Sequence, residues 1–523
     1  MATSSRKLLS TAPQGVMSTS NQDARRAFPL WRVSRMVVVV AALAPIAIYV
    51  YVAVRRLDYP FELEWLEGGE VEIVNRVVHG QAIYVAPSLH YVPYPYPPFF
   101  IWVSAAFAKV LGVGFLAPRL VSFLASLGVL ALLWQLVRRE TGDIVSGLVA
   151  AGLFAATYQT SGAYFDLARV DSLFLVLLLA AVAVARRGQT WQAGGLIGVL
   201  LFLSFFSKQT ALIAALPLLV YLVAFRRRVG IAACLTLGAL LGVSTLALDH
   251  ASHGWYDYYV FEELPSQGIN AHAIESFVPK SLFRPAGWAV VLGLVGLAVG
   301  LFARRGGRVA VLEDTAPNWP FWIAVGAGLV GASWLSLVHA GGSSDVLMPA
   351  YAAVAAFAGL AYHELTRSPS RYRALLGTTL AIVIAVQVAQ LARGSLHEIP
   401  SAASTEAGHR FIALVSSLPG QVIVADHPWY DTMAGKSSWA QSEAVHDVLR
   451  SSSAAARRDL EASIDATLAS PSVTAVFVDD RGDTIGPGFE RNFQLGPPVF
   501  TCTRCFFPVT DVPRRPYLRY DRR

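Results

Sequence analysis

Long apolar runs recur along the whole chain, and they decide what it can fold into. A helix that crosses a membrane needs about 20 mostly apolar residues. Hydrophobic residues make up 54% of the chain and charged residues 15%, whereas ordinary soluble domains have roughly 25% charged residues. The sequence therefore predicts a polytopic α-helical membrane protein with about eleven transmembrane helices. The runs lie at about 36–54, 116–137, 144–162, 171–185, 191–206, 209–225, 229–248, 285–303, 319–338, 346–363 and 374–391.

Small arginine clusters between these runs predict the orientation of the chain. Residues 1–35 are polar and basic, and no small-residue cleavage site follows the first run, so we expect an uncleaved span with a cytoplasmic N-terminus. With alternating spans, the pairs at 138–139 and 186–187 and the triplet at 226–228 all lie on the cytoplasmic side, as the positive-inside rule requires. The net charge of +7 thus reflects membrane topology, and we expect the cell membrane as the location and no nucleic acid as a partner.

The runs also divide the chain into segments. We predict a cytoplasmic basic segment at 1–35, a transmembrane domain at 36–392 with a first outer loop at 55–115, and an extracytoplasmic domain at 393–523. In the last segment, "QVIVAD" and "VTAVFVDD" have the apolar pattern of buried strands, and "SAAARRDLEASIDATLA" that of a helix. The C-terminal domain is therefore expected to be a small α/β domain.

Two local features of the expected outer side lead to further predictions. The apolar segment "FFIWVSAAFAKVLG" at 99–112 is about 14 residues long, too short for a span, and we expect it to lie along the outer membrane interface. Cys502 and Cys505 form a CxxC pair, and an oxidising compartment would favour a disulfide between them.

The first outer loop is rich in glutamate, in "FELEWLEGGEVEIVNRVVHGQAIY" at 61–84. If residues 62–78 are helical, Glu64, Glu67 and Glu70 share one face, where like charges repel. Such a cluster suits a divalent cation, an arginine, or a proton taken from a substrate hydroxyl. A solvated acidic helix face is the alternative.

A proline-rich stretch, "HYVPYPYPPFF", follows in the same loop. Its prolines force an extended path that presents Tyr91, Tyr94 and Tyr96 along a stiff strand. Aromatic rings placed in this way suit stacking on a sugar ring or a lipid head group. The alternative is a rigid connector that returns the chain to the membrane.

Ionisable residues lie where two of the apolar runs begin. In "YFDLARVDSLF", Arg169 could pair with Asp166 or Asp171 or bind a phosphate, while Asp171 could instead cap the helix that follows. Lys208 interrupts a long apolar stretch and could either extend to the interface or bind the phosphate of a lipid-linked substrate. Ionisable groups at membrane depth indicate a functional site by default.

Taken in order, these motifs resemble the GT-C superfamily of membrane glycosyltransferases, specifically the bacterial family-39 or dolichyl-phosphate-mannose-protein-mannosyltransferase-like group. The resemblance covers about residues 36–225 and implies an enzyme that transfers a sugar from a polyprenyl-phosphate donor to a lipid, polysaccharide or protein hydroxyl on the outer face of the membrane. It is based on "RVVHGQAIY", "YPYPPFFIWVSAAFAKVLG", "APRLVSFLASLGVLALL", "ARVDSLFLVLLLAAVA" and "SKQTALIAALP".

The resemblance also implies site residues. Family members place an acidic pair in the first outer loop as the catalytic or metal-binding site, but here Leu66 stands before Glu67 where an aspartate would be expected. Glu67 is therefore the expected catalytic carboxylate, with Glu64 in reserve, and Asp171 matches the arginine-x-aspartate position of the family. A divalent metal is a possible cofactor with no ligands assigned.

Such a transfer needs a base for the acceptor hydroxyl and cations for the leaving phosphate. We expect Glu67 and Asp171 in the first role and Arg169 and Lys208 in the second, with the strand that contains Tyr94 and Tyr96 admitting the lipid. The expected partners are a polyprenyl-phosphate sugar donor, a lipid or glycan acceptor and the membrane. A lipid or sugar transporter or flippase and a non-catalytic membrane scaffold are the alternatives.

Overall fold

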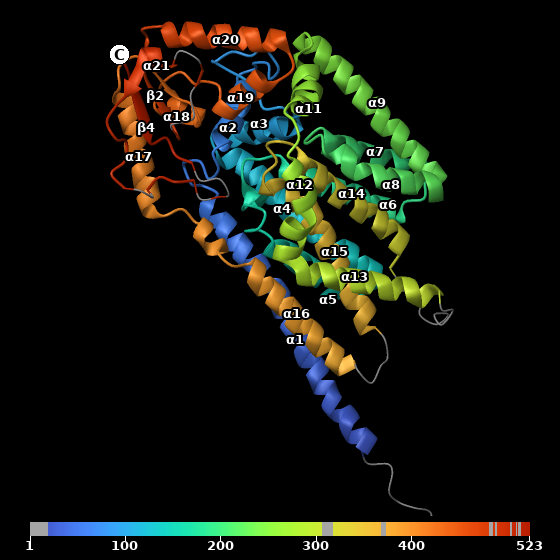
Figure 1. Ribbon diagram of the computed structural model, residues 1–523. Coiled ribbons are helices and arrows are strands. Elements are labelled where there is room, and N and C mark those ends of the chain that lie inside the picture. Colours follow the sequence, from blue (N-terminus) through green and yellow to red (C-terminus); the bar gives the residue numbers. More distant parts are fainter. Residues whose placement is uncertain are drawn as a thin grey trace, which may run out of the picture.

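A bundle of long helices makes up most of the molecule, and a mixed region of helices and strands lies across one end of it (Figure 1). The computed structural model describes residues 19–305, 317–367, 373–480, 485–486, 489–502, 505–508, 510 and 514–523. About half of the predicted basic segment, residues 1–18, lies outside the described residues.

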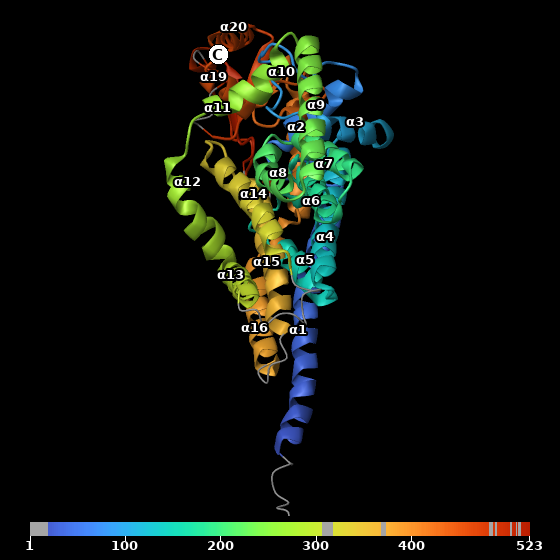
Figure 2. The same ribbon diagram turned by 90° about the vertical axis from the view of Figure 1, so that its right-hand side faces the viewer.

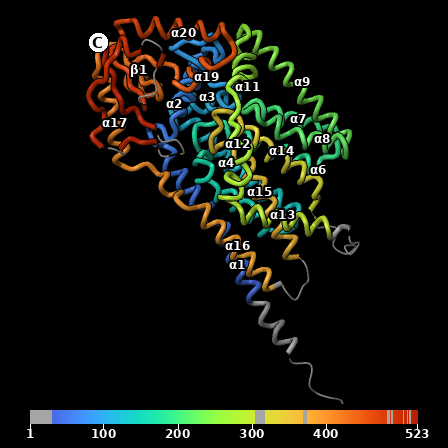
Figure 3. Tube along the Cα trace, viewed as in Figure 1, coloured from blue at the N-terminus to red at the C-terminus, as the bar shows by residue number. Residues whose placement is uncertain are grey.

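All eleven apolar runs form helices, which confirms the predicted helical class. By length and composition, seven described helical stretches could cross a membrane, whereas α5, α6, α7 and α8 are shorter, at 13 to 17 residues. Figure 3 shows α1 and α16 side by side although they are far apart in the sequence. The bounds are α1 (Thr19–Arg56), α4 (Leu116–Thr141), α5 (Ile144–Ala156), α6 (Asp171–Arg187), α7 (Trp191–Phe205), α8 (Ala211–Phe225), α9 (Arg227–Ser252), α13 (Arg284–Arg305), α14 (Trp319–Val338), α15 (Met348–Thr366) and α16 (Arg373–Leu391).

Helix α5 ends earlier than the run at 144–162 predicts. The chain turns after Ala156, where the Thr157 hydroxyl donates to the Phe154 carbonyl (2.7 Å) and Ala163 adopts a left-handed φ of 58°. The turn leads to the short helix η1 (Tyr164–Asp166) and then directly to α6. It therefore brings the predicted segment "YFDLARVD" to the end of the bundle.

The first outer loop contains α2 (Glu67–Val78) and α3 (Phe99–Leu111). Because α2 begins at Glu67, Glu64 precedes the helix, and the expectation that Glu64 shares a helix face with Glu67 and Glu70 is wrong. Helix α3 is a separate short helix, as the sequence predicts, and it runs across the direction of α4 (Figure 2).

Two glycines of α2 permit close packing on either side of the helix. A Cβ atom on Gly68 would lie 2.0 Å from Glu62 Oε1, and one on Gly69 would lie 2.1 Å from the Tyr94 hydroxyl. Any side chain at these positions would displace those groups. The Gly-Gly pair therefore lets α2 pack against both flanking segments of the loop.

Short helical pieces connect or extend the long helices. They are α10 (Trp255–Asp257), η2 (Tyr258–Glu263), α11 (Leu264–Ser266), α12 (Ala271–Ser276), η3 (Phe277–Phe283), η5 (Ser344–Leu347) and η6 (Ser395–Glu398).

The C-terminal region, after α16, contains a four-stranded sheet of order β1-β2-β4-β3. Strands β1 and β2 pair in parallel, whereas β4 pairs antiparallel with both β2 and β3. The two predicted strands are β1 and β2, and the predicted helix is α20; Cys502 and Cys505 form the expected disulfide. The elements are α17 (Ala402–Ser417), β1 (Gln421–Val424), α18 (Pro428–Met433), α19 (Ser442–Arg450), α20 (Ala454–Ala469), β2 (Val473–Val478), α21 (Phe489–Asn492), β3 (Phe493–Leu495) and β4 (Leu518–Arg522).

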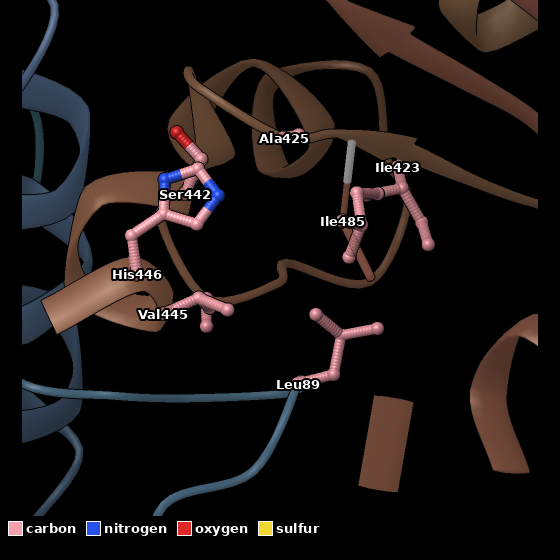
Figure 4. Close-up of a pocket in the computed structure, with 8 residues that line it drawn as sticks. Leu89, Ile423, Ala425, Ser442, Val445, His446 and Ile485 are labelled. Carbon is pink, nitrogen blue, oxygen red and sulfur yellow. The ribbon is translucent and has the colours of Figure 1, made fainter. Parts of the chain in front are cut away.

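The first outer loop packs directly into this region. Leu89 accepts a hydrogen bond from the Ala440 amide (2.8 Å) and donates its own amide to Ser463 Oγ (3.0 Å). Its side chain faces Ile423, Val445 and Ile485 across a small apolar hollow (Figure 4). This hollow measures about 10 Å³, about the minimum for one water molecule, so it is an imperfection of packing between the loop and the sheet.

Candidate active site

A cavity of about 480 Å³ lies where the first outer loop, the ends of several long helices and α19 meet. Its wall includes five of the residues predicted from the sequence, brought together from segments far apart in the chain. These five are Glu64, Tyr94, Tyr96, Arg169 and Lys208; the wall also includes Trp65, Gln209, His339, Asp345, Glu443 and Asp447.

Glu64 is a buried carboxylate at the wall of this cavity. Its Oε2 accepts the Leu66 amide at 3.1 Å, and its Oε1 has no hydrogen-bond partner among the described residues. Burial raises the pKa of Glu64 to about 7, with Arg169 acting in the opposite direction. A carboxylate that is free on one oxygen and titrates near neutral pH can accept a proton from a hydroxyl group.

Arg169 lies beside Glu64, with Nη1 at 4.0 Å from Glu64 Oε2. The guanidinium is 5.9 Å from the Tyr96 ring centroid and 6.0 Å from that of Tyr94, and Nη2 lies 3.5 Å from the Tyr96 hydroxyl. Its Nε and Nη1 are buried without a hydrogen-bond partner in the described part of the chain. Because a buried cation with free donors is costly, this arrangement suits an anionic ligand such as a phosphate.

Lys208 is held by two aspartates. Its ammonium group donates to Asp171 Oδ1 (2.5 Å) and to Asp345 Oδ2 (3.0 Å), and all three side chains are buried. The alternative in which Lys208 extends to the membrane interface does not apply, since its ammonium group is enclosed. The pairing of Asp171 with Lys208 indicates that this aspartate holds the lysine in place.

Glu67 lies behind the cavity wall in a saturated pair with Arg119. Its two oxygens accept hydrogen bonds from Arg119 Nε (2.9 Å) and Nη2 (2.6 Å) and from the Leu63 (2.7 Å) and Ala168 (2.8 Å) amides. Burial alone would raise the pKa of Glu67, but Arg119 outweighs it and holds the pKa below its ordinary value. This geometry favours a structural role for Glu67 and leaves Glu64 as the better-placed base.

Glu70 lies one turn further along α2 and is also buried. Its Oε1 has no hydrogen-bond partner within the described ranges. Burial raises the pKa of Glu70 to about 8; Arg169 opposes this shift and Asp171 adds to it. Glu64 at the cavity wall and Glu70 in α2 are thus two buried carboxyl groups of the first outer loop whose pKa values depend on the charge of Arg169.

The sequence suggests a divalent metal as a possible cofactor, but the described residues offer no set of ligands for it. Among the residues that the structure describes, no three His, Cys, Asp or Glu side chains are placed to hold a metal ion together. Glu67 and Asp171 instead pair with cations of the chain, Arg119 and Lys208. We therefore derive no step through a metal.

Two of the site residues, Asp345 and Arg119, were not identified from the sequence. Asp345 lies in the turn "HAGGSSD", and Arg119 lies in the apolar helix α4. Arg119 could have been found, because a lone arginine within a spanning helix indicates a buried partner. Asp345 could not, since nothing local indicates that it lies next to Lys208.

Comparison with known proteins gives two kinds of match. Residues 95–249 match the family model described as dolichyl-phosphate-mannose-protein mannosyltransferase. No curated protein matches the chain. Among solved structures, apo ArnT from Cupriavidus metallidurans has 14% identity and a TM-score of 0.53, over 76% of this chain and 85% of its own. The same protein bound to undecaprenyl phosphate has 12% identity and a TM-score of 0.52, over 97% and 98%.

An archaeal enzyme has a similar fold. The apo oligosaccharyltransferase of Archaeoglobus fulgidus has 12% identity and a TM-score of 0.51, over 85% of this chain and 69% of its own. At such low identity the solved structures show the fold alone, whereas the family model describes a glycosyltransferase. Together the solved structures show that the chain has an ArnT-like GT-C fold, and residues 95–249 are similar to the dolichyl-phosphate-mannose-protein mannosyltransferase family.

Proposed function

We propose that this protein transfers a sugar from a polyprenyl-phosphate-linked donor to a hydroxyl group of a lipid, polysaccharide or protein at the outer face of the cell membrane. In this proposal the N-terminus is cytoplasmic, residues 36–392 span the membrane and residues 393–523 form an extracytoplasmic domain. One observation supports it above all: a single cavity holds a carboxylate with a free oxygen, Glu64, beside a guanidinium with free donors, Arg169.

The donor phosphate would bind at Arg169. Its free Nε and Nη1 groups suit phosphate oxygens, and the rings of Tyr94 and Tyr96 define the wall around it. Lys208 adds positive charge nearby but is already bonded to two aspartates. A polyprenyl-phosphate donor is consistent with the family described for residues 95–249 and with the undecaprenyl phosphate bound by ArnT.

The transfer itself would be a displacement at the anomeric carbon of the sugar. The acceptor oxygen forms a bond to that carbon as the bond to the phosphate oxygen breaks, and Glu64 takes the acceptor proton. The leaving polyprenyl phosphate keeps the electron pair, and its negative charge is stabilised by Arg169. The labelled donor that reacts shows whether the transferred sugar is a hexose or a pentose.

Reconstitution tests this proposal. The purified protein would be placed in liposomes with labelled polyprenyl-phosphate sugars and candidate acceptors, with and without a chelator, and release of polyprenyl phosphate measured. Glu64→Gln is expected to abolish release, whereas Glu406→Gln, at an exposed carboxylate of α17, serves as the matched control and retains it. Movement of intact donor across the bilayer without cleavage would instead indicate a transporter, and full activity of Glu64→Gln would refute the assignment of the base.

A further inference from the structure

A buried row of three side chains joins the segment that contains Glu64 to the C-terminal region. Glu62 Oε2 contacts His427 Nδ1, and His427 Nε2 lies 3.0 Å from Asp479 Oδ1. Glu62, His427 and Asp479 are 2%, 0% and 4% exposed, so water does not screen these contacts. They come from the first outer loop, the start of α18 and the end of β2, three segments distant in the sequence.

The arrangement determines the charge of the histidine. A neutral imidazole has one N–H group, whereas an imidazolium has two. An ionised carboxylate can only accept, so both ring nitrogens donate when the two facing carboxyl groups are ionised. Burial alone would lower the pKa of His427, but Asp479 and Glu62 outweigh it and raise the pKa well above its ordinary value. His427 is thus a buried cation whose two hydrogen bonds fix the position of the loop.

Further contacts attach the same segment to the C-terminal region. The Glu62 amide donates to the Tyr430 hydroxyl (3.1 Å), and the Thr510 hydroxyl donates to the Leu63 carbonyl (3.1 Å). Gly68 leaves the space that the Glu62 carboxyl group occupies, since a Cβ atom there would lie 2.0 Å from Oε1. The C-terminal region therefore holds Glu62 and Leu63. Arg119 of α4 holds the residues just before them, donating to the Tyr59 and Phe61 carbonyls (2.6 Å each).

The segment after Glu64 is held on the other side, where Glu67 pairs with Arg119 of α4. Glu64 lies between these two attachments, and its own carboxylate accepts the Leu66 amide (3.1 Å) while Oε1 has no hydrogen-bond partner among the residues that the structure describes. The location of its carboxylate thus depends on the backbone on both sides. Loss of either attachment would let Glu64 move away from Arg169.

We propose that His427 is a positioning residue for sugar transfer: through Glu62 it holds Glu64 in place, so that the C-terminal region is part of the catalytic apparatus. This inference rests on the proposed function, in which Glu64 is the base. His427 itself does not line the cavity, so it acts through the loop and not on the substrate.

A pair of variants at one position separates positioning from folding. Glu62→Ala removes the attachment to His427. Glu62→Gln keeps a side chain of nearly the same size with an oxygen that can accept from His427, and removes only the negative charge. We expect Glu62→Ala to lower kcat by about 100-fold, the effect of a misplacement of about 1 Å, with the KM for donor nearly unchanged, and Glu62→Gln to retain most of the kcat.

The matched control is Arg522→Ala, which removes three hydrogen bonds to backbone carbonyls within the C-terminal region without contact to the loop. It is expected to lower thermal stability while leaving kcat unchanged. A kcat for Glu62→Ala equal to that of the wild type, equal losses for Glu62→Ala and Glu62→Gln, or the same loss for Arg522→Ala would each overturn the proposal.

Hydrogen exchange gives a readout that needs no activity. Glu62→Ala is expected to speed amide exchange in residues 61–67 relative to the wild type and to Glu62→Gln. If the wild type transfers no sugar but this exchange still rises, the proposed function fails while the attachment of the loop stands. If exchange is unchanged, the attachment through His427 is refuted whatever the activity.

Discussion

Replacing Glu67 by glutamine should lower the free energy of unfolding, and the structure gives the size of the effect. Glu67 and Arg119 are both 0% exposed, and the Glu67 carboxylate accepts four hydrogen bonds, two of them from Arg119. The amide group of the introduced glutamine would point its N–H donors at other donors and leave the Arg119 charge uncompensated. Breaking a buried ion pair by removing one partner costs about 3–5 kcal/mol, which for a chain of 523 residues corresponds to a fall in Tm of about 3–5 °C.

Thermal unfolding of the purified protein in detergent measures this effect, with Glu64→Gln as the matched variant. Glu64 has one oxygen without a partner among the described residues and a pKa raised by burial, so its neutral replacement should leave Tm nearly unchanged while transfer is lost. A Glu67→Gln protein with the Tm of the wild type would refute the reasoning from the ion pair. If that protein were also inactive, Glu67 would be the catalytic carboxylate, as the family resemblance predicts.

Three other outcomes follow from the cavity. Gly69→Ala should weaken donor binding, measured as a raised KM, because the added Cβ atom would lie 2.1 Å from the Tyr94 hydroxyl and displace that ring; an unchanged KM would contradict this. Lys208→Met should lower Tm, since it leaves both bonded aspartates buried and unpaired, at a cost of about 3–5 kcal/mol. The transfer rate should rise as the pH increases through about 7, where Glu64 loses its proton and becomes a base; a flat pH profile would exclude that role.

More of the fold than of the site could be predicted from the sequence. Apolar runs determine helices because the backbone must satisfy its own hydrogen bonds in a membrane, and each of the eleven runs is helical. The end of α5 was missed because the predicted run was extended to residue 162, although residues 157–162 are "TYQTSG", a mostly polar stretch. The helix ends at Ala156, and the chain turns at Gly162 and Ala163, both with left-handed φ. The polar stretch does not show where the turn leads, and that turn places Arg169 in the cavity.

The sequence predicted which residues belong to the site, but it did not predict which residues they contact. Tyr94, Tyr96, Arg169, Lys208 and Glu64 do meet in one cavity. A local sequence pattern shows, from the spacing of the glutamates, which of them would share a helix face. It contains no information on contacts between the first outer loop and residues more than 350 positions later, such as the one between Glu62 and His427.

The partners of the loop glutamates explain why one short stretch has so many of them. Glu67 faces Arg119, Glu62 faces His427 and Glu72 accepts from the Thr432 hydroxyl, so these three attach the loop to the bundle and to the C-terminal region. Glu64 and Glu70 each keep an oxygen without a hydrogen-bond partner in the described chain, as Glu62 does with Oε1. Arg119 keeps Glu67 ionised, whereas burial raises the pKa of Glu64 and of Glu70, so that either can exchange a proton near neutral pH. The acidic stretch is therefore both the attachment of the loop and the source of its base.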